Sequence, residues 1–552
     1  MCLLHNSVYK DTSLAFIEGV YSVTSCMQGR KDYQEELFVS FQLSDRVPEN
    51  NFYRRLKDLL HLDYLYKLTS DYYGDCGQKS IDPIVFFKLC LVGYLENITT
   101  DRGLMNHCDM RLDILYFLGY NITEALPWHS TLSRTRDLLP EALFRRVFED
   151  ILQKCVEAGL VSGHTQVVDS APIKANASMD SLELKVPAEK LEDYLRKVRY
   201  QSTSDREAPR RQARENKATT EQRTISGDKG ELQEIESRNQ RWKKDQDERP
   251  GAKSNHSKYT SNKTHYSPTD PDARISVKPG KARKLNYLSQ LSVDTACHVI
   301  THIGADFADK KDNQCLPQII GELKPRLQGM GLLFTTVMAD AGYSSGENYA
   351  LLEEENLQAY IPPHGTYKGG PEGFDYHKEG DYWVCRNGKK VTFRKVKVEG
   401  KNQIKKKQYF TRRSDCKGCV FKTACIGKAH EKRIEITYYN PEYQRTIARL
   451  KTPLGRRSKA IRQSTVEPVF GILTQHMGLR KLNTKGIRNA NKQMLLAGIA
   501  YNLKKLLKYA TPPPKSIADS LQNPTKEKHC SKRGLVSLFK LFLTPFLKPV
   551  DT

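Results

Sequence analysis

A long polar segment interrupts this chain and limits how the rest of it can fold. Roughly from residue 179 to residue 262, the 552-residue sequence is rich in Lys, Arg, Glu, Gln and Ser and poor in apolar side chains. Such a segment cannot offset the conformational entropy of ordering by burying apolar surface. We expect it to be a mobile helical insertion or disordered, and either a DNA-tracking arm or a solvated spacer. The remainder should form two to four folded units, because single domains usually run to about 100 to 200 residues.

The part before the polar segment has the pattern of a helical domain. From Asn50 to Leu160 apolar residues recur at helical spacing, as in FYRRLKDLLHLDYLYKL and EALFRRVFEDILQKCVEAGL. We therefore predict an all-α domain over residues 36–160, after an extension of unassigned structure over residues 1–35. The run ALPWHSTLSRTRDLLP has a turn, a Ser or Thr cap and a short helix with Arg134 and Arg136. This run is explained by a helix-turn-helix recognition element, in which Arg134 and Arg136 would contact DNA, and equally by an ordinary basic surface helix.

Strand patterns lie on both sides of the polar segment. A short β-prone run over Thr165–Asp169 precedes it, and the runs LNYLSQLSVD, HVITHIGADF and LLFTTVMAD follow it, with a helical pattern before the last. These elements predict an α/β fold over residues 161–364, with a mixed sheet flanked by helices. The first strand would end at Asp169 and the last at Asp340, so the two carboxylates are expected at strand ends.

The rest of the chain continues this core after a change of composition. Residues 365–440 are rich in Tyr, Lys and Gly in short alternating runs, which predicts a small β insertion. Helical patterns over residues 441–508 should complete the α/β core. Residues 509–552 begin with a proline-rich break and are expected to be a linker and tail.

The charge of the chain indicates a polyanionic partner. There are 88 Lys and Arg residues against 64 Asp and Glu residues, a formal charge of +24. Such a field attracts nucleic acid, although a ribosomal or merely basic protein would share it. The 13 cysteines are mostly scattered singly among apolar residues, as in reduced proteins. No stretch approaches the roughly 20 apolar residues of a membrane span, so we expect a cytoplasmic protein without a membrane partner.

Three acidic residues are candidates for metal-dependent chemistry on DNA. Cutting or joining phosphodiesters without a covalent intermediate requires charge neutralisation at both the attacking and the leaving oxygen, which two divalent ions supply. Hard oxygen ligands hold such ions. Asp169 and Asp340 would provide two ligands, and Glu467 in RQSTVEPVFG is the best-placed third. Asp294 at a strand end and Glu347 in a helix are its competitors.

Pro468 directly follows Glu467. Because a residue before proline is disfavoured in the α region, Glu467 is expected at a helix start or at a kink. Either position could direct its carboxylate inward.

These acids lie in runs that resemble a known family. After a helical amino-terminal domain, VVDSAPIKANAS, VMADAGYSSGENY and RQSTVEPVFG occur in that order, similar to the three acid motifs of insertion-sequence DDE transposases. The resemblance spans roughly Phe41 to Lys508. It implies an RNase H-like core that cleaves DNA at element ends and transfers strands to a target. Asp169, Asp340 and Glu467 would hold Mg²⁺ or Mn²⁺, in a homodimer or higher oligomer that is associated with the nucleoid when bound to DNA.

The basic residues near Glu467 depart from the family pattern. Many relatives have an Arg four residues before the glutamate and a Lys seven residues after it, where this chain has Gln463 and Thr474. Arg462, Arg480 and Lys481 lie close to these positions in the sequence. They are therefore our candidates for DNA contacts.

Four cysteines lie within the expected β insertion. Cys416, Cys419 and Cys425 form a C-x2-C-x5-C run, and Cys385 precedes them on an expected strand. Four thiolates can close a tetrahedral structural zinc site. Free thiols without a metal are the alternative. Similar cysteines occur in this part of the transposases that the chain resembles.

Two other functions share many of these features. An RNase H-like nuclease would use the same carboxylates and cut without joining strands. A non-catalytic DNA-binding protein derived from a transposase would need only the charge and the helical domain. The presence of all three acids argues against loss of catalysis.

Overall fold

The computed structural model describes most of the chain on both sides of the polar segment. Nearly all of that segment, the amino-terminal extension and the tail beyond residue 509 lie outside the described residues. The described residues are 40–74, 80–184, 262, 265–276, 283–365, 367, 369–400 and 403–509.

The first described part is helical, as its periodicity predicts. Several of its helices begin at polar caps. Asn51 accepts hydrogen bonds from the amides of Tyr53 and Arg54, and Asp82 caps the next long helix, whose first residue is proline. The helices are α1 Leu43–Arg46, α2 Phe52–Leu59, α3 Tyr64–Thr69, α4 Pro83–Leu95, α5 Asp101–Asp109, α6 Leu112–Leu118, α7 His129–Leu138 and α8 Glu141–Glu157, with a 3-10 turn η1 Ser70–Tyr72.

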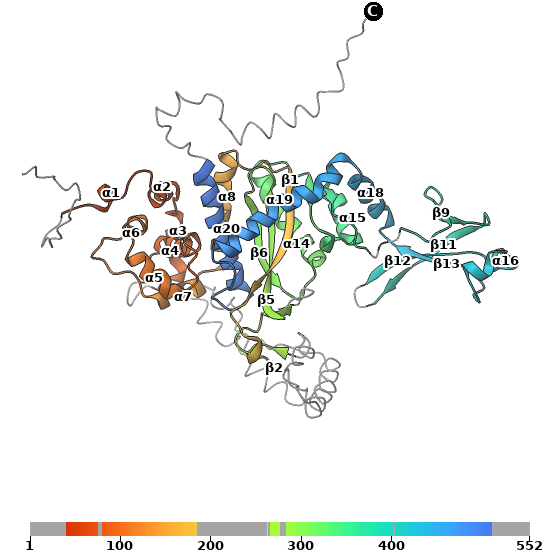
Figure 1. The fold of residues 1–552 in the computed structure, drawn as a ribbon, viewed down its shortest axis with the longest axis horizontal. Helices are drawn as coiled ribbons and strands as arrows, with labels where there is room; N and C mark the ends of the chain where they lie inside the picture. The colour runs from red at the N-terminus through yellow and green to blue at the C-terminus, as the bar shows by residue number, and fades with distance from the viewer. Residues whose placement is uncertain are drawn as a thin grey trace, which may run out of the picture.

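A mixed sheet follows and forms the centre of the molecule (Figure 1). β1 pairs antiparallel with β5 and parallel with β7, β7 pairs parallel with β8, and β5 also pairs antiparallel with β6 and with the short β4. The order β6-β5-β1-β7-β8 is that of an RNase H-like sheet, so the expected fold class is confirmed. The strands are β1 Thr165–Lys174, β4 Arg274–Ser276, β5 Lys284–Asp294, β6 Ile300–Phe307, β7 Thr336–Met338 and β8 Gln358–Tyr360.

Helices cover both faces of this sheet. On one face, Val167 and Ile173 of β1 pack in one cluster with residues of α19 (Pro453–Gln475) and α20 (Ile487–Tyr509). On the other face, Val168 packs with residues of α14 (Asp312–Gly329) and α15 (Gly346–Glu354). The alternation of neighbouring β1 residues between the two clusters is what the pleat of a strand requires. α18 (Asn440–Leu450) lies beside α15 and β8.

The helical region and the sheet share one hydrophobic core. A single cluster contains Leu56 and Phe86 of the helical region, Ile303 of the sheet, and Leu496 of α20. α20 packs along α8 and also touches α2 and α4. The sequence suggested an independent amino-terminal domain, but its apolar faces are completed by a helix some 350 residues later.

A fragment ending near Leu160 should therefore fail to form a fixed tertiary structure. Without α20, the apolar faces of α4 and α8 that pack against it would be exposed to water. We expect residues 40–160, expressed alone, to retain helical far-ultraviolet circular dichroism, to bind a hydrophobic dye and to lose the near-ultraviolet signal. Cooperative unfolding of this fragment with a native near-ultraviolet spectrum would contradict the shared core.

The β insertion is a separate small sheet that projects from the core beyond α18 (Figure 1). Trp383 is buried there with Val391, Tyr409, Ile434 and Ile436, so this tryptophan packs in a core and is not free to stack on a base. Its strand order is β13-β12-β11-β10-β9. The strands are β9 Phe374–His377, β10 Tyr382–Cys385, β11 Lys390–Glu399, β12 Ile404–Phe410 and β13 Arg433–Thr437, with short helices α16 Arg413–Cys416 and α17 Lys422–Cys425.

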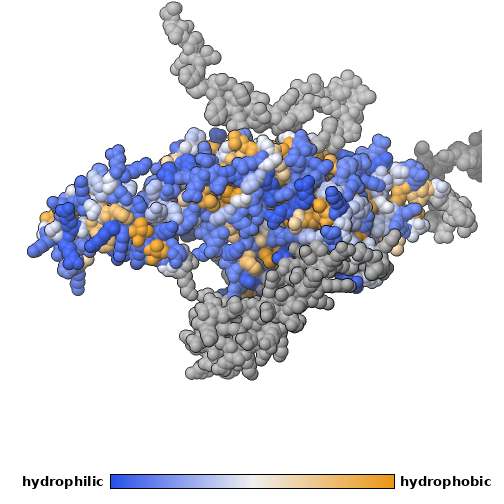
Figure 2. Space-filling model, turned by 180° about the vertical axis from the view of Figure 1, so that it is seen from behind, coloured by the Kyte–Doolittle hydropathy of each residue, from blue (hydrophilic) through white to orange (hydrophobic). Residues whose placement is uncertain are grey.

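The surface of the described residues is largely hydrophilic, with apolar residues in scattered small groups on the face in Figure 2. A search of these same residues finds no helix with the length and apolar character to cross a membrane.

The remaining short elements are η2 Met179–Ser181, β2 Glu183–Leu184, β3 His265–Tyr266 and η7 Ala341–Tyr343.

Candidate active site

Asp169 and Asp340 are brought together by neighbouring parallel strands. The register of β1 and β7 pairs Val167 with Met338, and each aspartate lies two residues further along its strand direction. Burial is the main cause of the raised pKa of Asp169, and the charge of Asp340 acts on the same carboxyl group and raises its pKa further. Asp340 itself is held by a turn in which its Oδ1 accepts the amide of Gly342 at 2.9 Å. The pairing of these two acids follows from the sheet topology.

Asp169 is not at the end of its strand, contrary to the sequence prediction. β1 continues for five more residues to Lys174, and these pair with β5 from Gln290 to Asn286. Pro172 is tolerated because the pairing of β1 with β7 stops at Val167, which leaves that edge of β1 without a neighbouring strand in the described residues. The open edge starts next to Asp169.

Asp169 lies in an environment that opposes its negative charge. Burial is the largest cause of a pKa raised to about 6, and the charges of Asp340 and Asp312 raise the pKa further. The Ser170 amide, which donates to Oδ1 at 2.8 Å, and the Arg462 guanidinium lower it. A cation close to this carboxyl would favour its ionised form.

Arg462 connects the first acid to the third. Its Nη1 lies 2.7 Å from Oδ2 of Asp169, and its Nη2 lies 4.0 Å from Oε1 of Glu467. Both the arginine and Asp169 have side chains that are 17% exposed, whereas Glu467 is 56% exposed. The sequence suggested Arg462 as a DNA contact, but in this structure its guanidinium is paired with a carboxylate of the site.

Glu467 lies inside a helix, which corrects the expectation of a helix start. α19 runs from Pro453 to Gln475 and continues through Pro468. Proline has no amide hydrogen, so the carbonyl of Ser464 receives no helical hydrogen bond from it. The helix persists because Val466 and Val469, on both sides of the proline, are fully buried against the sheet. This packing holds Glu467 on the side of α19 near Arg462.

A fourth carboxylate, Asp312, belongs to the same group and was missed in the sequence. It is the first residue of α14, and its Oδ1 accepts a hydrogen bond from the Ser170 hydroxyl at 2.6 Å. A Cβ added to Gly342 would lie 2.9 Å from Oδ2 of Asp312 and 3.0 Å from Oδ1 of Asp340, so a glycine is needed between them. An acid in the first turn of a helix usually stabilises the helix by interacting with its dipole, so the sequence gives no signal that Asp312 lies beside the other acids.

The group offers oxygen ligands of the kind that Mg²⁺ and Mn²⁺ prefer. Within the parts of the chain that the structure describes, no three His, Cys, Asp or Glu side chains have positions that would hold a metal ion. Asp169 and Asp340 interact, while Arg462 lies between Asp169 and Glu467. Burial raises the pKa of Asp169, and the charges of Asp340 and Asp312 raise it further, so a divalent ion bound beside this carboxyl would favour its ionised form.

The two competing acids have other positions. Asp294 is fully buried and accepts hydrogen bonds from the amides of Ser162 and Gly163 and from the side chain of Gln166, so it stabilises the turn before β1. Glu347 is exposed on α15. Among the described residues, no charge of Asp294 or Glu347 is a main contribution to the pKa of Asp169, unlike the charges of Asp340 and Asp312.

The two arginines of α7 have opposite environments. Arg134 is exposed, and its Nη2 lies 3.4 Å from the hydroxyl of Ser130 in the same helix. Arg136 is buried, with 6% of its side chain exposed, and donates to both carboxylate oxygens of Asp101 at 2.9 and 3.1 Å. The expectation that Arg136 contacts DNA is therefore wrong for this structure. The helix begins after Trp128, which makes no side-chain cap, and not after a Ser or Thr.

Arg480 and Lys481 are both exposed, in the segment between α19 and α20. Lys481 forms an isolated parallel bridge with Lys174 at the end of β1. Both side chains line a cavity next to the sheet and do not contact the carboxylates.

The four cysteines of the insertion are half-buried and unpaired by disulfides. Cys419 Sγ accepts from the Nδ2 of Asn387 at 3.7 Å, and Cys416 Sγ lies 3.2 Å from the Thr411 hydroxyl. Asn387 follows Cys385 by two residues, so the contact joins the turn after Cys385 to the C-x2-C run. In the described part of the chain, no three of these thiols lie close enough together to hold a metal ion.

Comparisons with known families match the chain in two places. A family described as "Transposase domain (DUF772)" matches residues 41–138, which include α1 to α7. A family described as "Transposase DDE domain" matches residues 384–507, which include Glu467, helices α18 and α19 and most of α20. No curated protein matches the chain.

Proposed function

Because this chain is a member of the insertion-sequence DDE transposases, we propose that it cuts DNA at the ends of its element and transfers the cut strands to target DNA. The observation that carries this proposal is the meeting of Asp169 and Asp340 at neighbouring parallel strands, with Arg462 linking Asp169 to Glu467. Acids from three separate elements are what two-metal phosphodiester chemistry requires.

In this proposal each side chain has a stated role. Asp169, Asp340 and Glu467 hold the divalent ions, Mg²⁺ or Mn²⁺. Once bound, these ions would lower the pKa of the attacking water and stabilise the leaving oxygen. Asp312 accepts a hydrogen bond from the Ser170 hydroxyl, and this bond keeps the start of α14 beside β1. Arg462 opposes the effect of burial by lowering the pKa of Asp169, and its guanidinium, paired with that carboxyl, would also contact a scissile phosphate held there.

The test uses labelled element-end DNA with purified protein and Mg²⁺. Cleavage at the end and covalent joining of that end to a plasmid are the expected products. Supplying pre-cleaved ends with a free 3′ hydroxyl separates the two steps. Cleavage without joining would favour a nuclease, and binding without either product would favour a non-catalytic DNA-binding protein.

We also propose that the protein acts as a homodimer or higher oligomer on DNA in the cytoplasm. Two element ends must be held together before both are joined to one target, which two active sites on a symmetric assembly would achieve. Arg134 on α7 and Arg480 and Lys481 after α19 are the proposed DNA contacts, since all three are exposed cations.

For the β insertion we propose a structural zinc ion held by Cys385, Cys416, Cys419 and Cys425. Two observations support it: the Asn387–Cys419 contact joins the two cysteine segments, and among the described residues the buried apolar core of this sheet consists of five side chains. So small a core provides little stability, and a metal bound by thiolates adds folding free energy. Thiolates select zinc, while the carboxylates favour harder ions.

Purified protein is expected to contain about one zinc ion per chain. Replacing Cys416 and Cys419 by serine together should release that zinc and make the insertion sensitive to protease, with little effect on α20 or the sheet. Cys297→Ser, in the main core, is the control that should retain zinc. Zinc-free protein with a protease-resistant insertion would rule out the site.

A further inference from the structure

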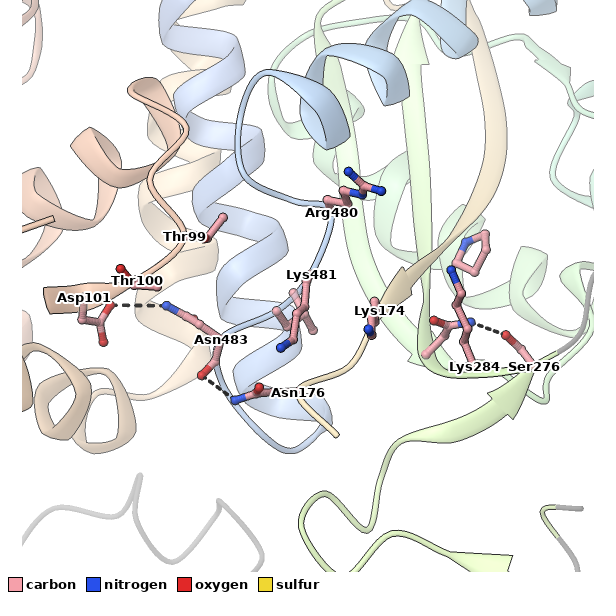
Figure 3. A pocket seen from close by; sticks show the side chains of 13 residues that line it. Thr99, Thr100, Asp101, Lys174, Asn176, Ser276, Lys284, Arg480, Lys481 and Asn483 are labelled. Atoms are coloured by element: carbon pink, nitrogen blue, oxygen red, sulfur yellow. Dashed lines mark hydrogen bonds between the residues drawn. The ribbon is translucent and has the colours of Figure 1, made fainter. Parts of the chain in front are cut away.

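A cavity of about 1220 Å³ separates the helical region from one end of the central sheet, and none of the proposed metal ligands lines it (Figure 3). One wall is the turn before α5, with Thr99 and Thr100. The opposite wall is the end of β1 and the start of β5, with Lys174 and Lys284. The segment after α19, with Arg480, Lys481 and Asn483, lies between them.

The charge of this cavity is positive and uncompensated. Lys174, Lys284, Arg480 and Lys481 are all exposed, and none of them forms an ion pair with another described residue. The acidic residue of the lining, Asp101, is neutralised by the bidentate pair with Arg136 and also accepts from Asn483. Four unpaired cations face one space whose described acidic residue is already paired, and such a space provides a site for a polyanion.

The remaining lining is suited to phosphate groups and not to bases. It consists of hydroxyl and amide groups, such as those of Thr99 and Asn176, together with Pro172 and Leu482. No aromatic side chain is among the described residues that line the cavity, so these residues offer bases no surface on which to stack. Contacts of this kind position a backbone without reading its sequence.

The cationic segment is fixed by hydrogen bonds that its backbone amides donate. The amide of Leu482 donates to the Lys174 carbonyl at 2.9 Å, and the amide of Gly478 donates to Asn97 Oδ1 at 2.7 Å. At its other end, the Gly486 amide donates to Asp270 Oδ1 at 3.0 Å. Ordered backbone on both walls presents the cations at set positions, which lowers the entropic cost of binding.

The distance along β1 relates the cavity to the acids. Lys174 lies five residues after Asp169 on the same strand, which corresponds to about 16 Å at a rise of roughly 3.3 Å per residue. DNA advances about 3.4 Å per base pair, so this is a separation of about five base pairs.

We propose that this cavity holds the sugar-phosphate backbone of duplex DNA about five base pairs from the phosphate that is cut. The proposal rests on the proposed function and adds a second place on the chain where the substrate is held. Because it involves phosphates alone, the cavity contributes equally to the binding of any duplex, and the recognition of element ends lies elsewhere.

The test compares two double variants that each remove two exposed lysines. Lys174→Gln with Lys481→Gln removes cavity charges, and Lys504→Gln with Lys508→Gln removes charges near the end of α20. The probe is a short labelled duplex of arbitrary sequence, titrated over a range of salt concentrations. The cavity variant is expected to bind on the order of tenfold more weakly at 0.1 M salt, with a salt slope lower by about two. The control variant should behave like the wild type.

Equal affinity and equal salt slope for the cavity variant and the wild type would overturn the cavity as a DNA site. If the wild-type protein in the same experiment cuts element ends, the transposase function stands and only the cavity proposal fails. A wild type that neither binds the duplex nor cuts an element end would instead remove the proposed function. Thermal unfolding of both variants near the wild-type temperature verifies that only binding has changed.

Chemical protection provides a second measurement on the unaltered protein. An amine-reactive reagent is applied with and without the duplex, and modified lysines are identified by mass spectrometry. DNA should protect Lys174, Lys284 and Lys481 and leave Lys504 reactive. Unchanged reactivity of all three cavity lysines at a saturating duplex concentration would contradict the proposal.

Discussion

Replacing Asp169 by asparagine is expected to reduce DNA cleavage by at least about a thousandfold while leaving DNA binding nearly unchanged. Loss of a metal ligand removes several kcal/mol of transition-state stabilisation, and ~1.4 kcal/mol corresponds to a factor of ten in rate. The same result is expected for Asp340→Asn and Glu467→Gln. Cleavage is measured on labelled element ends with Mg²⁺, and binding is measured with the metal chelated.

Two acids that lie outside the group serve as controls. Glu347→Gln, at an exposed position on α15, should cut DNA at the wild-type rate. Asp294→Asn should lower the stability of the fold, because its buried carboxylate accepts several hydrogen bonds at the start of β1. Retention of Mg²⁺-dependent cleavage in an Asp169, Asp340 or Glu467 variant would remove that residue from the site.

Replacing Arg136 by alanine is expected to lower the free energy of unfolding by about 3 to 5 kcal/mol. The change leaves Asp101 in the same partly buried position without its bidentate partner. It also removes side-chain packing beside Lys492, whose buried ammonium donates to the Arg136 carbonyl at 3.0 Å. Urea denaturation of the full chain measures the difference.

Arg134→Ala is the matched comparison, because it removes the same charge from the same helix. Arg134 is exposed, so its loss should change stability by no more than about 0.5 kcal/mol and should weaken DNA binding. If Arg136→Ala unfolds at the wild-type urea concentration, the buried ion pair does not stabilise the helical region as described.

The opposite environments of these two arginines could have been predicted from helical periodicity. Residues two apart in a helix lie about 200° apart around its axis, so Arg134 and Arg136 could not both have faced DNA. Leu132 and Thr135 are buried on the inner side of α7, and this places Arg136 inward. The periodicity alone could have corrected the expectation.

The strands were predictable from their alternation and apolar runs, and β5 and β6 lie where LNYLSQLSVD and HVITHIGADF predicted them. The length of β1 was not predictable. Pro172 normally indicates the end of a strand, and only the structure shows that this part of β1 has an edge without a partner strand among the described residues, where proline is tolerated. Asp312 could not be found, since an acid at the start of a helix is common and only tertiary packing brings it to Ser170. Tertiary packing also explains why the helix continues through Pro468, which the sequence did not predict. Burial of the flanking valines outweighs the one missing hydrogen bond.

The single interior that joins α4 and α8 to α20 has a consequence for how such proteins diversify. Proteins with separable recognition domains change their targets by exchanging whole modules. Here an exchanged amino-terminal part would meet the wrong partner surface on α20 and leave cavities or clashes, each of which costs stability. If the helical region recognises DNA as proposed, we expect new specificity to arise by substitution of exposed side chains on a retained scaffold, and chimeras between distant relatives to fail at folding before they fail at recognition.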